Sequence, residues 1–152
     1  MKILDALKKE AVIVGLQSSD KAGVIKELVG PVASIAKLDE NELIDVLTER
    51  ERLGSTGIGG GIGIPHGKLK NLDTLVLGFG LSRKGVDFES IDGRPTYIFF
   101  LLLTPDNSTG LHLKVLARIS RILKDDPFRG RLLKAADRDE VYRIIEENDE
   151  EF

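Results

Sequence analysis

The only two histidines of this 152-residue chain, His66 and His112, stand in different surroundings. His66 follows Pro65 near the end of the glycine-rich stretch GIGGGIGIPHGK, residues 57–68, whereas His112 follows a polar loop. A neutral imidazole with an ordinary pKa of about 6.5 is nucleophilic near pH 7. Glycine has no Cβ, so backbone N–H groups can converge on an anion. These residue types point to an anion or a phosphoryl group held at His66.

Arginines precede the glycine-rich stretch at Arg50 and Arg52, in the last turn of an expected helix. A guanidinium offers a planar fork of donors that matches phosphoryl oxygens. His112 lies just inside the start of another expected helix, where free N–H groups and the helix dipole favour an anion. Together these groups would let His66 accept a phosphoryl group and would hold its charge.

Simpler interpretations stay open at this point. His66 could be an ordinary turn residue, the glycines could form a wide turn, and the arginines could be solvated charges at a helix end. His112 could be a residue at the edge of the core or beside a helix cap. The stretch is neither a dinucleotide fingerprint nor a P-loop, since no strand is expected before it and Leu69 follows Gly67-Lys68. Two histidines without cysteine or an obvious third ligand are a poor metal signature, so no metal is expected.

Composition narrows the class of protein. The chain is 41% hydrophobic and 31% charged, as in globular proteins, and its formal charge of −3 argues against a nucleic-acid partner. No cysteine is present, which excludes disulfides and thiolate chemistry. No apolar run is long enough for membrane insertion, and the first residues do not resemble a signal peptide. We expect a soluble cytoplasmic protein with a single domain over residues 1–152.

The pattern of apolar residues predicts helices interleaved with strands. Residues 96–103 are apolar at every position after Thr96, which indicates a central strand buried on both faces of a sheet. Gly30-Pro31 should interrupt or kink a helix that is capped within residues 18–20. We further expect strands at residues 11–16 and 72–81 and helices at residues 3–9, 39–54, 111–124, 126–135 and from 137 onward. The predicted fold class is therefore α/β, with helices on both faces of one sheet.

One segment of the chain resembles a known protein family. Arg50-Glu51-Arg52-Leu53, followed by GSTGIGGGIGIPHGK (54–68), is similar to the enzyme IIA domain of the fructose, mannitol and nitrogen-regulatory type, a component of the bacterial phosphoenolpyruvate-dependent phosphotransferase system. The likeness covers nearly the whole chain, with supporting segments at residues 86–105, 111–125 and 128–147. It implies a single enzyme IIA domain whose mixed β-sheet is flanked by helices on both faces.

The resemblance also implies roles for individual residues. His66 matches the histidine that accepts the phosphoryl group, on Nε2, and Arg50 and His112 match the arginine and the second histidine that stabilise it. Ser55 and Thr56 match a polar turn that could donate hydrogen bonds. The donor would be a small histidine phosphocarrier protein that reacts by in-line transfer, with no cofactor and no metal. For the exposed apolar surface that docks such carriers, the candidates are Ile58, Ile62 and Leu69, although an ordinary core position is the favoured interpretation of all three.

Three functions remain under this resemblance. The residue patterns of two segments, GSTGIGGGIGIPHGKL (54–69) and DRDEVYRII (137–145), favour the nitrogen-regulatory type, with a regulatory target protein as downstream partner. A sugar-specific IIA of the fructose or mannitol type would instead pass the phosphoryl group to a cysteine of a IIB domain during sugar uptake. A third hypothesis, from a different class, is a non-catalytic regulatory binding module of the same fold.

Overall fold

A mixed β-sheet forms the centre of the molecule in the computed structural model, which describes residues 1–152. Five strands follow the order β1-β5-β6-β3-β2, and β4 also pairs with β6. The β1–β5, β3–β6 and β4–β6 pairs are parallel, whereas β5–β6 and β2–β3 are antiparallel. The strands are β1 (Leu7–Val14), β2 (Gly57–Gly59), β3 (Ile62–Gly63), β4 (His66–Leu69), β5 (Val76–Val86) and β6 (Thr96–Pro105).

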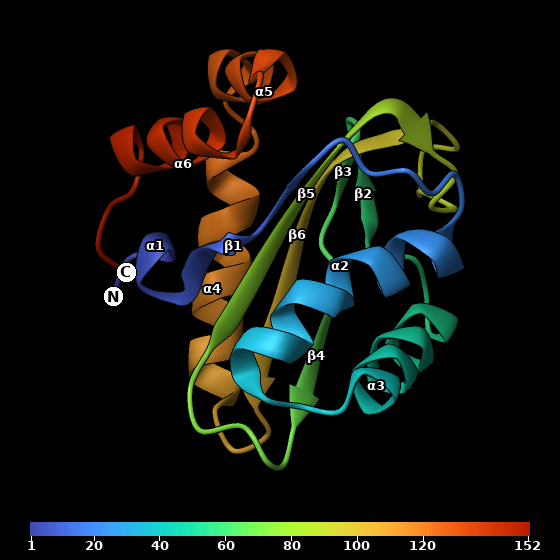
Figure 1. Cartoon of the computed structure of the whole chain (residues 1–152), viewed down its shortest axis with the longest axis vertical. Coiled ribbons are helices and arrows are strands. Elements are labelled where there is room, and N and C mark those ends of the chain that lie inside the picture. Colours follow the sequence, from blue (N-terminus) through green and yellow to red (C-terminus); the bar gives the residue numbers. More distant parts are fainter.

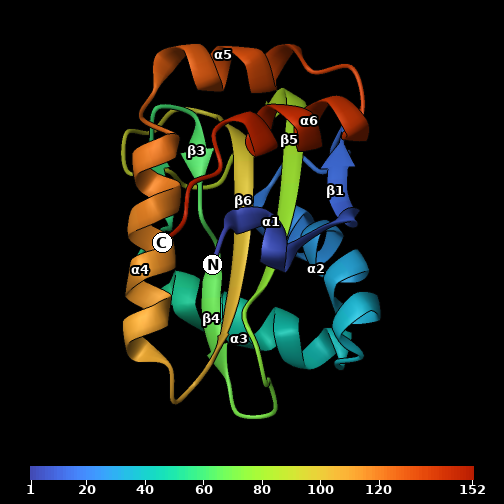
Figure 2. The same cartoon turned by 90° about the vertical axis from the view of Figure 1, so that its left-hand side faces the viewer.

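Helices cover both faces of this sheet, so the predicted fold class is confirmed (Figures 1 and 2). α2 and α3 pack on one face, and α4, α5 and α6 lie on the other. The helices are α1 (Ile3–Ala6), α2 (Lys21–Ala36), α3 (Glu40–Arg52), α4 (Thr109–Ile122), α5 (Asp126–Lys134) and α6 (Arg138–Glu147). The N-caps Asp39 and Asp137 accept from the backbone N–H groups of Glu42 and Glu140, as the sequence predicts.

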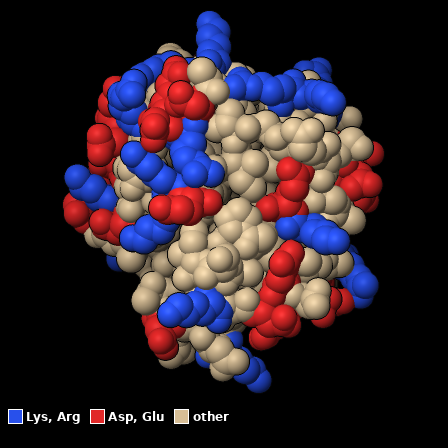
Figure 3. Space-filling model, in the orientation of Figure 1, with Lys and Arg blue, Asp and Glu red and all other residues tan.

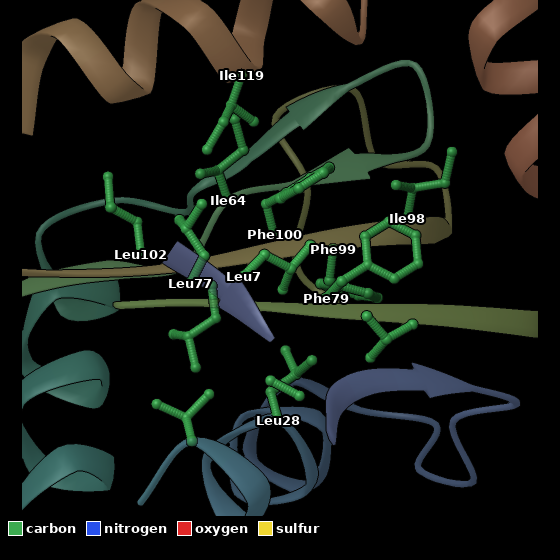
Figure 4. Packing of buried hydrophobic residues seen from close by; sticks show 14 of the residues in the cluster. Leu7, Leu28, Ile64, Leu77, Phe79, Ile98, Phe99, Phe100, Leu102 and Ile119 are labelled. Carbon is green, nitrogen blue, oxygen red and sulfur yellow. The ribbon is translucent and has the colours of Figure 1, made fainter. Parts of the chain in front are cut away.

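β6 is the central strand that its apolar composition predicts. Every residue of β6 except Tyr97 is buried, because β5 flanks it on one side and β3 and β4 on the other. Figure 4 shows that α2 contributes Leu28 below the sheet and α4 contributes Ile119 above it. Phe79 and Phe100, on neighbouring strands, meet edge to face with ring centroids 5.1 Å apart. The core therefore holds β6 rigidly between two helical layers.

Several element boundaries differ from the prediction: β1 spans Leu7–Val14 rather than residues 11–16, and β5 ends at Val86 rather than at residue 81. The first helix stops at Ala6, because pairing of Leu7 with Leu77 of β5 draws the next residues into β1. α2 continues through Pro31 to Ala36 instead of being interrupted, since buried residues on both sides of the proline, such as Leu28 and Val32, hold the helix against the sheet. β5 begins at Val76 rather than at residue 72. None of these shifts moves a candidate site residue.

The surface seen in Figure 3 carries acidic and basic side chains mixed around an uncharged central area. Charges of one sign do not gather there into a broad field. None of the helices combines the length and the apolar character that crossing a bilayer requires.

Candidate functional site

The glycine-rich stretch forms a hairpin rather than an open loop. β2 and β3 pair across a turn in which Gly59, Gly60 and Gly61 have φ values of 93°, 66° and 80°, a region that favours glycine. The N–H of Gly60 donates to the carboxylate of Asp92 at 3.1 Å. The expectation of a loop whose glycine N–H groups converge on an anion is therefore not met, because a turn and a short ladder use this backbone. His66 lies beyond the hairpin, as the first residue of β4.

Two backbone hydrogen bonds fix the position of His66, one at the preceding residue and one at its ring. The N–H of Leu102 on β6 donates to the carbonyl of Pro65 at 3.0 Å. Nδ1 of His66 lies 2.7 Å from the carbonyl oxygen of Ile64. A carbonyl only accepts, so the neutral imidazole must carry its proton on Nδ1, which leaves the lone pair on Nε2. Burial lowers the pKa of His66 below its ordinary value, and the nearby Arg50 guanidinium lowers it further, against the opposing effect of the Ile64 bond. His66 is therefore a neutral imidazole at pH 7.

His112 faces His66 from the first turn of α4. The two ring centroids are 5.3 Å apart and the rings are tilted by 58°. The His112 side chain is buried, and its Nδ1 lies 2.5 Å from the hydroxyl of Thr104, at the end of β6. Burial, reinforced by His66, Lys68 and Arg50, lowers the pKa of His112 to about 4. His112 is also neutral at pH 7, and the atom of its ring left free of Thr104 is Nε2.

Arg50 reaches the site because α3 packs very closely on β4. A Cβ on Gly67 would lie 2.6 Å from Cγ1 of Val46, so only glycine permits this approach. Val46 and Arg50 are four residues apart on α3 and therefore share one face of the helix. Nη1 of Arg50 donates to the carbonyl of Gly54 at 2.9 Å, which anchors the guanidinium at the helix end. Arg50 lies in the last turn of α3, as predicted.

His66, Arg50 and His112 line one open pocket of about 530 Å³. Lys68 lies on its wall and donates to the hydroxyl of Thr109 at 3.2 Å. The pocket thus combines two cationic side chains with two neutral imidazoles, which suits a dianionic phosphoryl group. The other lining residues are Val46, Glu49, Leu53, Gly67, Leu113 and Leu116.

Ser55 and Thr56 lie beside this pocket, but their hydroxyls are already engaged. Ser55 Oγ donates to the carbonyl of Phe88 at 2.9 Å, and Thr56 Oγ1 donates to the buried carboxylate of Glu51. Both residues line a smaller hollow of about 210 Å³ that also borders Arg50 and His66. Their role as donors to a phosphoryl group stays a prediction, and the structure gives their protons other acceptors.

The exposed apolar side chains near the pocket differ from those expected. Ile62 and Leu69 are core residues, each 4% exposed, whereas Ile58 is 40% exposed. The most exposed apolar side chains at the pocket are those of Leu53, at 85%, and Leu113, at 60%. Leu53 was not among the predicted candidates. Residue 113 of α4 turns outward because His112, Val115 and Ile119 form the buried face of that helix.

Arg52 needs no role in the pocket, since its guanidinium pairs with Glu49 on the surface. Thr104, Lys68, Glu51 and the packing role of Gly67 were not predicted from the sequence. Thr104 could have been found from the sequence, because it is a lone hydroxyl residue after a long apolar run. No sequence pattern pointed to Glu51. The structure contains no group of three or more His, Asp or Glu side chains that could hold a metal ion.

Comparisons with known proteins show relatives along nearly the whole chain. The family model described as "Phosphoenolpyruvate-dependent sugar phosphotransferase system, EIIA 2" matches residues 5–148. A nitrogen regulatory protein of Bradyrhizobium diazoefficiens is 37% identical over 145 residues, which are 95% of each chain. The fructose-specific EIIABC component of Bacillus subtilis is 35% identical over 150 residues, which cover 98% of this chain and 24% of that protein.

Solved structures show the same fold. The crystal structure of the nitrogen regulatory protein from Neisseria meningitidis superposes with a TM-score of 0.88 at 29% identity, over 93% of this chain and 97% of that one. The mannitol IIA protein of Escherichia coli superposes with a TM-score of 0.78 at 20% identity, over 91% and 97%. This chain therefore belongs to the type 2 enzyme IIA family of the phosphoenolpyruvate-dependent sugar phosphotransferase system.

Proposed function

We propose that this protein is a phosphoryl carrier of the nitrogen-regulatory type, which acts in the cytoplasm and accepts a phosphoryl group on Nε2 of His66 from a histidine phosphocarrier protein. The observation that carries the proposal is the bond between Nδ1 of His66 and the Ile64 carbonyl, inside a pocket shared with Arg50 and His112. That bond leaves the Nε2 lone pair free for nucleophilic attack.

In this mechanism Nε2 of His66 attacks the phosphorus of the carrier's phosphohistidine in line with the bond that breaks. A new N–P bond forms at His66, and the carrier's imidazole leaves with the electron pair of the old one. The Ile64 carbonyl stabilises the positive charge that develops on the His66 ring. Arg50 and Lys68 neutralise the equatorial oxygens, and His112 is placed to contact them through Nε2.

Support for a regulatory output comes from sequence similarity along the full chain. The nitrogen regulatory relative from Bradyrhizobium diazoefficiens matches this chain over 95% of both lengths. The second candidate is a sugar-specific IIA, and the observation in its favour is the 35% identity to the fructose-specific component of Bacillus subtilis. The two candidates share the chemistry at His66 and differ in the partner that follows.

The phosphoryl-acceptor role is tested by reconstitution. The protein is incubated with phosphoenolpyruvate, enzyme I and the carrier, and intact mass spectrometry measures an acid-labile gain of one phosphoryl group. We expect the gain in the wild type and none in His66→Ala. A wild type that gains nothing, or a His66→Ala variant that gains equally, would show that the protein is a binding module without phosphotransfer.

The regulatory assignment has its own test. Phosphorylated protein is mixed with fructose-type and mannitol-type IIB domains, and loss of the phosphoryl group from His66 is followed with time. We expect the group to stay on His66 with both domains. Rapid transfer to a IIB cysteine would replace the regulatory assignment with the sugar-specific one.

A further inference from the structure

Glu51 is a buried carboxylate at the end of α3 that the proposed mechanism does not use. It is only 7% exposed and accepts from the N–H of Thr56 at 3.1 Å and from the Thr56 hydroxyl. Nζ of Lys21 lies 2.9 Å from the same carboxylate and 5.0 Å from the centre of the Phe88 ring. Three donors thus satisfy the carboxylate, and Lys21 balances its charge inside the protein.

Hydrogen bonds continue from Thr56 to the nucleophile. The carbonyl of Thr56 accepts from the N–H of Ile64 at 3.0 Å. The carbonyl of Ile64 in turn accepts from Nδ1 of His66 at 2.7 Å. Because Pro65 has no N–H, the peptide group between Ile64 and Pro65 offers only this acceptor. An unbroken series of contacts therefore joins Glu51 to the ring of His66.

We propose that Glu51 is a positioning residue: its carboxylate fixes Thr56, Thr56 fixes the carbonyl of Ile64, and that carbonyl holds His66 in the tautomer with a free Nε2. The tautomer of an imidazole is set by the bond that its other nitrogen makes. If the segment around Ile64 shifts, Nδ1 loses its acceptor and the ring can carry its proton on either nitrogen. A fraction of the molecules then has no nucleophilic lone pair at Nε2.

Lys21 is the second part of this device. A buried carboxylate without a counter-charge would repel a dianionic phosphoryl group, whereas Nζ of Lys21, 2.9 Å from the carboxylate of Glu51, offsets part of its charge. The carboxylate can therefore brace the turn after α3 without weakening the pocket for its anion. The proposal rests on the phosphoryl-acceptor role of His66 and adds to it the reason why Nε2 is available.

The test weakens the contacts of Glu51 by two separate routes. Thr56→Val keeps the shape of a buried side chain but removes the hydroxyl that donates to Glu51, and Thr56→Ser keeps that hydroxyl. Glu51→Gln is combined with Lys21→Met, since Gln alone would leave the ammonium of Lys21 without its counter-charge. Arg83→Met is the matched control, because it removes bonds to the carbonyls of Leu133 and Ala135 that lie outside the site.

Two measurements are made on each variant. Ring ¹⁵N chemical shifts of His66 in the unphosphorylated protein at pH 7.5 report which nitrogen carries the proton. Single-turnover kinetics with the phosphorylated carrier report the rate of transfer. We expect Thr56→Val and the Lys21→Met/Glu51→Gln double variant to mix the tautomers and to slow transfer about tenfold. Thr56→Ser and Arg83→Met should keep the wild-type shifts and rate.

The outcomes separate this proposal from the proposed function. If His66 keeps the Nδ1–H tautomer in Thr56→Val and in the double variant, Glu51 has only a structural role and the positioning proposal is wrong. The same conclusion follows if Arg83→Met slows transfer as much at equal loss of thermal stability. The tautomer is read without any phosphoryl donor, so it still tests the proposal if the wild type accepts no phosphoryl group.

Discussion

The surroundings of the two histidines differ in the kind of group that holds Nδ1. At the start of β4, Nδ1 of His66 meets a backbone carbonyl, that of Ile64. At the start of α4, Nδ1 of His112 meets a side-chain hydroxyl, that of Thr104. A carbonyl accepts only, whereas a hydroxyl both donates and accepts. His66 is therefore fixed in one tautomer, and His112 is free to adopt either.

Because of this difference, the two rings are suited to different roles in phosphoryl transfer. A nucleophile needs its lone pair on Nε2 before the phosphoryl group arrives, and the Ile64 carbonyl ensures that. A group that supports the phosphoryl oxygens must present N–H when the pocket is filled, and the Thr104 hydroxyl permits that state. With ring centroids 5.3 Å apart, a phosphoryl group on one ring lies within reach of the other. Changes at each ring should therefore have effects of different size.

Arg50→Ala should have the largest effect among the residues that support His66. The guanidinium lies in the pocket and stabilises the equatorial oxygens during transfer, so we expect transfer to slow about a hundredfold. The rate of phosphoryl transfer is measured from quenched reaction samples by mass spectrometry. Arg52→Ala is the matched control, because Arg52 pairs with Glu49 on the surface of the same helical turn. Equal rates for the two variants would remove Arg50 from the site.

His112→Ala should be milder, because this ring supports the phosphoryl group without forming a bond to phosphorus. Loss of one hydrogen bond to a charged oxygen predicts a rate about tenfold lower, with phosphorylation at His66 preserved. The same kinetics measure it, together with thermal unfolding. Loss of folding would show instead that the buried His112 serves mainly as a structural residue.

Thr104→Val should be milder still, since it leaves the His112 ring in place and removes only its hydroxyl partner. We expect transfer to slow about threefold, with Thr104→Ser close to the wild type. Ring ¹⁵N shifts of both histidines provide the sharper comparison. Only His112 should respond to Thr104→Val, and a response of His66 instead would contradict the separate control of the two rings.

The sequence predicted the elements whose local signals agree with their packing. The apolar run of β6 and the caps at Asp39 and Asp137 are confirmed because each depends on residues close in the chain. The α2 helix passes Pro31 because buried contacts outweigh one missing hydrogen bond, and no local signal reports that balance. The longer elements could thus be predicted, but the short strands β2, β3 and β4 of the glycine-rich stretch and the boundaries set by distant packing could not.

For the site, residue types were predictable but the contacts between them were not. Composition and spacing singled out His66, Arg50 and His112, and the structure brings all three to one pocket. The glycines were expected to bind an anion, but a hairpin uses them. Thr104 was not expected, because its contact with His112 depends on how α4 lies against the end of β6. A contact between side chains of two different secondary-structure elements is difficult to predict from a single sequence.

The last prediction concerns the free energy of unfolding, on which the two rings have no pH-dependent effect at neutral pH and a measurable one only in acid. The folded-state pKa of His112 is about 4, below the ordinary 6.5, so the unfolded chain takes up a proton first as the pH falls. The contribution of His112 to stability is complete above pH 6.5 and is lost progressively between pH 6.5 and about 4. His66 acts in the same direction, because its pKa is also lowered.

Urea unfolding at a series of pH values measures this loss. The His112→Gln variant retains a side chain that can bond to Thr104 but cannot take up a proton, so its free energy of unfolding should fall less steeply below pH 6.5. Carboxylates titrate alike in both proteins, and the difference between the two curves isolates His112. Parallel curves would show that His112 is not held neutral by the fold, and its distinction from an ordinary exposed histidine would then disappear.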